Sequence, residues 1–141
     1  MSDIADITAL IHEYAFRLDA GDLDGVAALF EHAEFRSTQH ERVLRGAKAV
    51  RSLYEPVILY DDGTPRTMHQ ISNVTVQIDG EEATARSYFT VLQVTGQGLH
   101  PILAGEYGDT FSSVDGQWQF MERVVCPLLI GDLSRHMRPA S

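Results

Sequence analysis

The sequence predicts a single α+β domain in which helices come first and an antiparallel sheet follows. In the first part of the chain, apolar residues recur at the three- and four-residue spacing of amphipathic helices. From Arg66 onward the period changes to two, which is typical of strands with one buried face. This order favours helices packed on one face of the sheet. The 141 residues suit one compact domain spanning 1–141.

Two helices are predicted at the start of the chain. The first begins after Ser2 and ends at Gly21, which can adopt the left-handed backbone that closes a helix. Its apolar stripe consists of Ile4, Ile7, Leu10, Ile11, Tyr14, Ala15 and Leu18. Asp22 is placed to cap a second, shorter helix. We therefore expect a helical hairpin.

A short strand and a third helix are expected before the sheet proper. Residues 33–38 have the pattern of a short strand, followed by a loop or second short strand up to Leu44. Gly46 precedes a third helical stretch, 47–59, whose last turn is weakened by Pro56. Residues 60–65 have the composition of an exposed loop.

Four long strands follow in a meander. Asp79-Gly80 and Asp115-Gly116 supply tight turns between them. The strands are expected at about 66–78, 82–94, 102–114 and 117–125. In the last strand, simple alternation places Phe120 on one face and Arg123 on the other. The tail after Gly131 is either a short helix that closes a pocket or a frayed end.

Composition excludes several classes of partner. Eleven Lys and Arg against 20 Asp and Glu give a formal charge of -9, so the average surface potential repels nucleic acid. No apolar stretch approaches the roughly 20 residues that span a bilayer. Cys126 is alone, and the N-terminal residues lack the basic and apolar regions of a secretory signal. We expect a cytoplasmic protein.

Asp19 and His69 are the main candidates for chemistry. Asp19 falls in the last turn of the first helix, where the helix dipole disfavours a carboxylate by a few tenths to about 1 kcal/mol. It is either an exposed loop residue or a carboxylate that orients a base in a cleft. His69 begins the first long strand and is either a core histidine or a base. A neutral imidazole accepts a proton near pH 7, and a carboxylate on its other nitrogen fixes the tautomer.

Aromatic and basic side chains supply further candidates. The Tyr14 phenol can donate a hydrogen bond to a substrate oxygen or pack in the core. The residues that line the same cavity, or else simply pack in the core or sheet, are Phe35, Tyr54, Tyr88, Tyr107 and Arg123. The other histidines and Cys126 lack metal-ligand spacing, and the GxSxG, Walker A and GxGxxG motifs are absent. We expect neither a metal nor a cofactor.

Four ordered stretches carry a family resemblance over nearly the whole chain. They are LDAGDLD at 18–24, TMHQISN at 67–73, DGEEATA at 79–85, and DGQW at 115–118 followed by Glu122-Arg123. Together they resemble the SnoaL-like branch of the nuclear transport factor 2 superfamily. The resemblance implies a cone-shaped, cystatin-like α+β barrel: a curved antiparallel sheet packed against N-terminal helices. It also implies a homo-oligomer, dimer or trimer.

The resemblance extends to catalytic positions. Scytalone dehydratase, hexachlorocyclohexane dehydrochlorinase and bile-acid 7-alpha-dehydratase use an Asp on the first helix and a His on the strand after the third, where this chain has Asp19 and His69. Tyr14 matches a Tyr of the bile-acid enzyme. Phe35 replaces a catalytic Tyr of scytalone dehydratase, and Gln93 falls near that enzyme's second His. Scytalone itself is therefore disfavoured as the substrate.

Two classes of function follow from this resemblance. The first is a cofactor-independent lyase of the dehydratase type, or an isomerase or cyclase, that uses a His-Asp dyad on a small, largely apolar cyclic or polyketide-like molecule. The second is a non-catalytic small-molecule-binding or assembly domain of the same fold. A structural role like that of a ring-hydroxylating dioxygenase small subunit is a third possibility, for which the chain is short. The residues do not identify the substrate.

Overall fold

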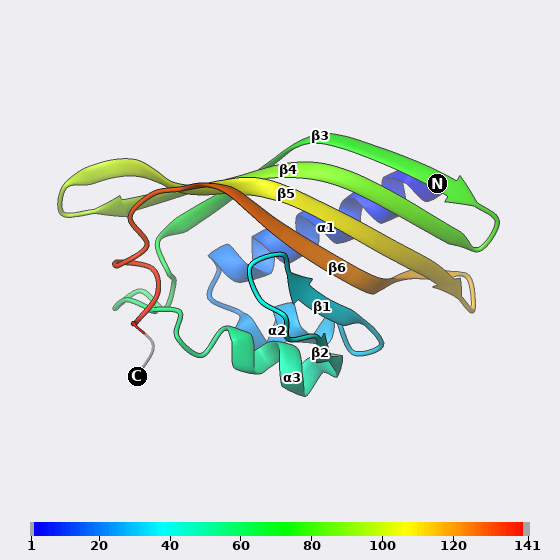
Figure 1. Ribbon diagram of the computed structural model, residues 1–141, viewed down its shortest axis with the longest axis horizontal. Helices are drawn as coiled ribbons and strands as arrows, with labels where there is room; N and C mark the ends of the chain where they lie inside the picture. Colours follow the sequence, from blue (N-terminus) through cyan, green and yellow to red (C-terminus); the bar gives the residue numbers. More distant parts are fainter. Residues whose placement is uncertain (1, 140–141) are drawn as a thin grey trace.

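A computed structural model describes residues 2–139 and has the predicted α+β architecture (Figure 1). Three helices and two short strands precede four long strands. The elements are α1 (Asp3–Asp19), α2 (Leu23–Ala28), β1 (Glu34–Ser37), β2 (Leu44–Arg45), α3 (Gly46–Leu53), β3 (Thr67–Asp79), β4 (Glu82–Thr95), β5 (Gly98–Val114) and β6 (Gln117–Ile130).

The first two helices have the predicted caps. The Ser2 side chain accepts a hydrogen bond from the Ala5 amide at 3.1 Å, and the Asp22 carboxylate accepts one from the Gly25 amide at 2.9 Å. Gly21, with φ of 78°, turns the chain between the two helices. These local signals fix the end of α1, and therefore the position of Asp19.

The third helix is shorter than the sequence predicts. It ends at Leu53, with Tyr54 as its C-cap, whereas the apolar pattern extends to residue 59. A proline disfavours helical backbone in the residue before it, and Pro56 follows two residues after the cap. The next residues pair instead with the end of the chain: the Ile58 amide donates to the His136 carbonyl at 2.8 Å.

All six strands form one sheet in the order β2-β1-β6-β5-β4-β3. β1 pairs with β6 in parallel, and the other neighbours are antiparallel. Both predicted tight turns are present, with Gly80 at φ 64° and Gly116 at φ 80°. β5 begins four residues before its expected start, at Gly98 rather than residue 102.

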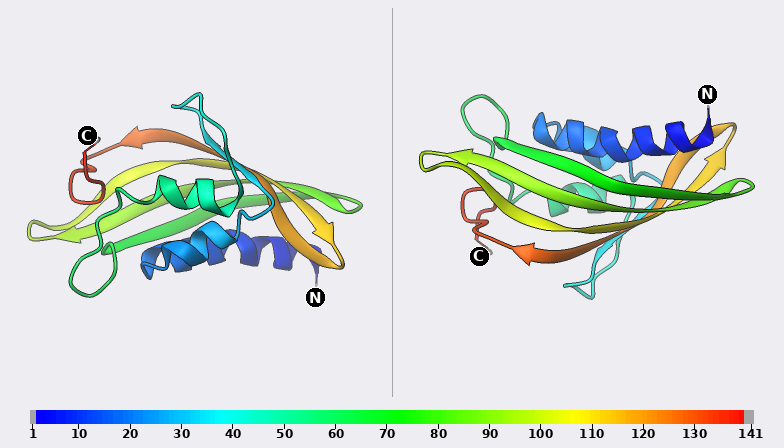
Figure 2. Two further views of the ribbon diagram at one scale, coloured as in Figure 1. Left: turned by 90° about the horizontal axis from the view of Figure 1, so that it is seen from below. Right: turned by 90° about the horizontal axis from the view of Figure 1, so that it is seen from above.

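The helices cover one face of the sheet. Figure 1 shows α2 and α3 below the strands and α1 crossing behind them, and Figure 2 shows α1 along one face of the sheet and the strands bending along their length. α1 packs mainly against β3. Along β4, alternate side chains point into this covered interior and are buried, namely Ala83, Ala85, Ser87, Phe89, Val91 and Gln93. None of the helices within residues 2–139 combines the length and the apolar character that a bilayer crossing requires.

Two β-bulges change the predicted face and length of β6. The register with β5 skips Met121 and Leu128, so each is an extra residue in β6. The bulge at Met121 shifts the alternation by one, and Phe120 and Arg123 are consequently both buried. The prediction that they lie on opposite faces is therefore wrong. β6 also continues through Pro127 to Ile130, because a proline beside a bulge does not interrupt the ladder.

The C-terminal tail is held in place rather than frayed. Residues 131–139 form no helix, but a turn at 134–136 and a bridge between Val57 and Met137 fix them against the segment after α3. The Arg138 amide donates to the Pro56 carbonyl at 2.8 Å. Figure 1 shows the red tail beside the green segment that leads into β3.

Candidate functional site

Asp19 and His69 form a hydrogen-bonded pair where the end of α1 meets the start of β3. His69 Nδ1 lies 2.6 Å from Asp19 Oδ1. Asp19 Oδ2 accepts a hydrogen bond from the His69 backbone amide at 2.7 Å, and Oδ1 also accepts one from the Thr67 hydroxyl at 2.9 Å. The imidazole is 6% exposed and the carboxylate 20% exposed. The two side chains therefore form a largely desolvated pair that is held at three points.

The contacts of Asp19 explain a carboxylate at the negative end of a helix. The unfavourable dipole interaction of at most about 1 kcal/mol is offset by an amide donor, a hydroxyl donor and an imidazole. Asp19 is therefore not an exposed loop residue, since its carboxylate is 20% exposed and binds three groups of β3. A carboxylate at this position pulls the first residues of β3 onto the end of α1.

The hydrogen bond to Asp19 also fixes the tautomer of His69. An ionised carboxylate only accepts hydrogen bonds, so the proton of a neutral imidazole resides on Nδ1 and the lone pair on Nε2. No side chain or backbone group within residues 2–139 hydrogen-bonds that Nε2. The nitrogen is thus left to act on something other than the protein.

Tyr14 lies in a separate cluster of buried phenols. Its hydroxyl is 2.6 Å from the Tyr54 hydroxyl, and its ring packs edge-on against Tyr107 at 5.9 Å. Burial raises the pKa of Tyr14, and raises the pKa values of Tyr54 and Tyr107 well above the usual range of tyrosine. All three remain protonated hydrogen-bond donors at neutral pH.

A buried ion pair completes this cluster. Arg123 donates to both carboxylate oxygens of Asp109, at 2.7 and 2.9 Å, and neither side chain is exposed. The guanidinium lies 3.7 Å from the Tyr107 ring centre and 4.4 Å from that of Tyr14. Burial opposes its charge, but the Asp109 carboxylate and the two phenols together raise the pKa of Arg123. Its Nη1 atom is buried without a partner.

Four of the five predicted pocket residues are buried, and one is not. Phe35, Tyr54, Tyr107 and Arg123 lie in the covered interior, where Phe35 packs edge-on against Tyr54 at 6.5 Å. The prediction that Tyr88 lines the pocket is wrong, because Tyr88 is 42% exposed. Its neighbours Ser87 and Phe89 are buried on β4, so strand alternation turns Tyr88 to the outer face.

Two residues of this region were not among the sequence-based candidates. Asp109 lies between Tyr107 and Phe111 on the inward face of β5. An acidic residue among apolar residues that alternate in this way indicates a buried carboxylate, and could have been recognised from the sequence. His136 gave no such signal, because the tail has no periodicity. It is nevertheless buried at 8% exposure.

His136 lies within electrostatic range of the dyad. Burial, together with the nearby His69, lowers the pKa of His136 to about 4, although the Asp19 carboxylate opposes this shift. Its imidazole is therefore neutral at pH 7. Over residues 2–139, no three His, Cys, Asp or Glu side chains are grouped closely enough to hold a metal ion.

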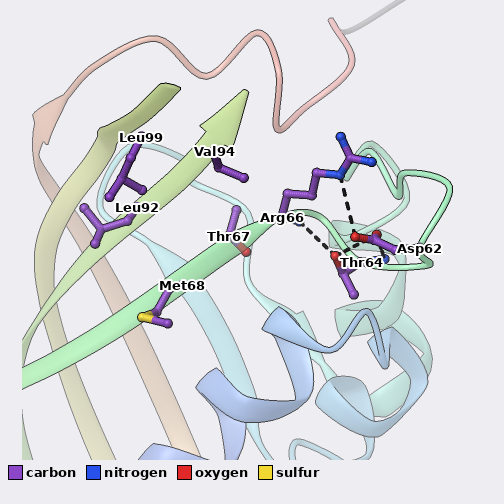
Figure 3. A pocket seen from close by; sticks show the side chains of 8 residues that line it. All are labelled: Asp62, Thr64, Arg66, Thr67, Met68, Leu92, Val94 and Leu99. Carbon is purple, nitrogen blue, oxygen red and sulfur yellow. Dashed lines mark hydrogen bonds and ion pairs between the residues drawn. The ribbon is translucent and has the colours of Figure 1, made fainter. Parts of the chain in front are cut away.

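The surface formed by residues 2–139 includes a larger cleft and a smaller hollow. A cleft of about 540 Å³ lies at the ends of β3, β4 and β5, with Met68, Leu92, Val94 and Leu99 on one side and the loop around Asp62 on the other (Figure 3). A smaller hollow of about 180 Å³ lies by Leu29 and Trp118. Neither is lined by Asp19 or His69. Met68 lines the larger cleft and is exposed at 58%, whereas the neighbouring His69 side chain points to the other face of β3.

Comparison with known proteins gives both a family and a fold. Residues 1–124 match the model of the SnoaL-like domain. A protein of unknown function from Mycobacterium tuberculosis has 28% identical residues and a TM-score of 0.76, with 91% of this chain and 73% of that chain covered. A candidate scytalone dehydratase from Novosphingobium aromaticivorans has 25% identity and a TM-score of 0.74, with 92% and 87% covered.

A third solved structure supports the fold alone. An NTF2-like protein with a cystatin-like fold from Novosphingobium aromaticivorans has 23% identity and a TM-score of 0.74, with 89% of this chain and 82% of that chain covered. No protein with a curated description matches the chain significantly. Since the family model covers most of the sequence, this chain belongs to the SnoaL-like domain family and has the NTF2-like fold that its sequence predicts.

Proposed function

We propose that the protein is a cofactor-independent lyase or isomerase that removes a proton from a carbon next to an electron-withdrawing group. The observation that carries the proposal is the 2.6 Å contact between Asp19 Oδ1 and His69 Nδ1, which leaves Nε2 without a protein partner. The SnoaL-like family and the similarity to a candidate scytalone dehydratase support a small-molecule-processing enzyme.

The base is His69 and the orienting group is Asp19. Nε2 takes the proton from carbon, and the Asp19 carboxylate stabilises the imidazolium that forms. The electron pair of the C–H bond becomes a carbon–carbon double bond as the bond to a neighbouring hydroxyl breaks. The imidazolium then returns its proton to the leaving hydroxyl, so substrate becomes product and water with no other reactant. If the proton returns to a different carbon, the same pair performs an isomerisation.

The buried phenol cluster supplies a polarising group in this proposal. Tyr14 and Tyr54 remain protonated at neutral pH, and a protonated phenol can donate a hydrogen bond to an enolate oxygen. Asp109 neutralises Arg123, and Asp19 faces His69, so each of these two basic groups has an acidic partner. The substrate class that fits these surroundings is neutral, cyclic and largely apolar.

The test uses a simple activated substrate. A β-hydroxy-α-tetralone has an acidic α-proton and a β-hydroxyl, and its dehydration yields α-naphthol, which is followed by fluorescence. Isomerisation is tested with a β,γ-unsaturated cyclohexenone, whose conversion to the conjugated enone is followed by ultraviolet absorption. We expect turnover by the wild type, and a fall of about 10²- to 10⁴-fold in His69→Gln and Asp19→Asn.

Matched variants control for unrelated effects. Asp24→Asn and His40→Gln change the same residue types at exposed positions and should retain full activity. Circular dichroism and thermal unfolding establish that each variant is folded. Wild-type turnover in either dyad variant would disprove the mechanism.

A second candidate function is favoured by the packed interior. Phe35, Tyr54, Tyr107 and Arg123 fill the space beneath the sheet, and neither hollow is lined by the dyad. That arrangement suits a binding or assembly domain with a structural histidine. This alternative predicts no proton abstraction from either probe, including no exchange of α-protons of α-tetralone in D₂O as followed by NMR.

A further inference from the structure

We propose that the C-terminal tail, residues 131–139, is part of the substrate site and that His136 hydrogen-bonds a neutral oxygen of the substrate. That oxygen is the hydroxyl or carbonyl beside the carbon that His69 deprotonates. The inference rests on the proposed function, and it adds a residue and a substrate preference to it.

The tail is anchored beside the dyad by a chain of contacts. Thr67 donates to Asp19 and is paired with Gln93 across β3 and β4. The Gln93 side-chain amide donates to the Arg135 carbonyl at 2.9 Å and to the Pro65 carbonyl at 3.1 Å. The residue after Arg135 is His136, and the bond from the Ile58 amide to its carbonyl fixes its backbone. Hydrogen bonds from β4 and from the segment after α3 therefore fix the position of His136 at this end of the sheet.

Buried polar atoms near this anchor lack partners. Nδ1 of His136 and Oε1 of Gln93 are both fully buried and make no hydrogen bond. Leaving such an atom buried and unpaired is unfavourable, because the hydrogen bond that it makes to water in the unfolded chain is lost. A ligand with a hydroxyl or carbonyl group supplies what the His136 nitrogen lacks.

The chemistry of His136 favours an uncharged ligand oxygen. A neutral imidazole has one N–H donor and one lone pair, so it can either donate to a carbonyl or accept from a hydroxyl. It carries no positive charge to balance a carboxylate. His69 and Arg123 already face acidic partners, Asp19 and Asp109. A neutral histidine that polarises a carbonyl is an established way to stabilise a developing enolate.

The tail also lies outside the part of the chain that defines the family. The SnoaL-like match ends at residue 124, before the last part of β6 and the whole tail. The dyad lies within the matched segment and His136 does not. In this arrangement the shared domain supplies the base, and the tail of this particular chain supplies a contact that selects the substrate.

The test compares three variants with the β-hydroxy-α-tetralone assay. His136→Phe keeps an aromatic ring but no hydrogen bond, and we expect kcat/KM to fall about 10- to 100-fold. His136→Asn keeps a donor and an acceptor and should recover most of that loss. His40→Phe, at an exposed loop position, is the matched control and should be unchanged. Thermal unfolding establishes whether His136→Phe is folded.

A binding measurement separates this inference from the proposed function. The probe is α-tetralone, which has the carbonyl but no leaving group, and the protein is His69→Gln with ¹⁵N-labelled histidine. We expect the His136 ring nitrogens to shift on binding, and the carboxylate analogue α-naphthoate to bind at least about 10-fold more weakly.

The outcomes are distinct. Wild-type activity in His136→Phe, or unshifted His136 nitrogens when α-tetralone is bound, overturns the role of the tail while leaving the dyad mechanism intact. Activity in His69→Gln overturns the dyad mechanism, whereas the His136 shift on binding is measured independently of turnover. Full activity of a folded His136→Phe together with equal binding of α-naphthoate would leave the tail no part in the site.

Discussion

The Asp19 carboxylate holds His69 at two points, accepting the backbone amide on Oδ2 at 2.7 Å and the imidazole Nδ1 on Oδ1 at 2.6 Å. One acid therefore sets both the start of β3 and the orientation of the ring that the strand carries. Because the two roles are coupled, changes in the neighbours of Asp19 should affect activity more than their exposure suggests.

Thr67 is the third group on this carboxylate, and its loss should affect the dyad. Thr67→Val keeps the shape of the side chain but removes the donor to Asp19 Oδ1. We expect about a 3- to 10-fold fall in kcat and a loss of stability of about 1 kcal/mol. Thr67→Ser keeps the hydroxyl and should remain close to the wild type in the tetralone assay. Equal activity of the two variants would contradict this positioning role.

Removing one partner of the Arg123–Asp109 pair should destabilise the protein strongly, whereas replacing both partners by apolar residues should not. Arg123→Met leaves the Asp109 carboxylate buried without its partner, and we expect a loss of about 3–5 kcal/mol in urea unfolding at pH 7. The double variant Arg123→Met, Asp109→Leu removes both charges and should recover most of that loss. A double variant as unstable as the single one would show that the charges are needed for folding.

Gly21 should tolerate no side chain. A Cβ there would lie 2.0 Å from the Gly63 carbonyl oxygen, and φ is 78°. Gly21→Ala is expected to lower the free energy of unfolding by about 2 kcal/mol or more. The backbone at Gly63 must move away from the new Cβ, and the alanine must adopt a strained positive φ. The control is Gly63→Ala, which has a similar φ of 80° but nothing within 4 Å of the added carbon. It should lose only about 1 kcal/mol; an equal loss in thermal unfolding would contradict the steric explanation.

The low pKa of His136 predicts a specific dependence of stability on pH. Its pKa is about 4 in the folded protein and about 6.5 when unfolded, so the unfolded chain binds more protons between these values. This histidine therefore leaves the free energy of unfolding unchanged above pH 6.5 and lowers it by up to about 3 kcal/mol as the pH falls towards 4.

The measurement for this prediction is urea unfolding across that range in the wild type and in His136→Asn. His69 and Asp19 act electrostatically on His136 and are present in both proteins, so the difference between the two stability curves reports on His136. The wild type should lose stability relative to the variant on acidification. Parallel curves would mean that this imidazole is not buried as a neutral group.

Local signals in the sequence were enough to predict the main elements. The caps at Ser2 and Asp22 and the turns at Asp79-Gly80 and Asp115-Gly116 act within a few residues, and the structure has all four. The early end of α3 at Leu53 was not predictable in the same way. Pro56 indicated a weak last turn, but the residues after Leu53 also pair with the tail through Ile58 and His136, which are far apart in the chain.

The site shows the same division. Asp19 and His69 were singled out by their chemistry and by the family resemblance, and the structure places them in contact. The partner of Arg123 was missed although Asp109 lies in a buried register, and the bulge at Met121 hid the inward direction of Arg123. His136 could not be recognised, because only the folded tail brings it near the dyad.

The two bulges in β6 have a geometric consequence for the whole domain. β6 uses 14 residues from Gln117 to Ile130 to run beside the 12 residues of β5 from Leu103 to Val114. A strand that has more residues than the neighbour with which it pairs must bend, because its extra residues lengthen it locally. The extra residues Met121 and Leu128 therefore contribute to the curvature of the sheet, although neither needs to touch a substrate.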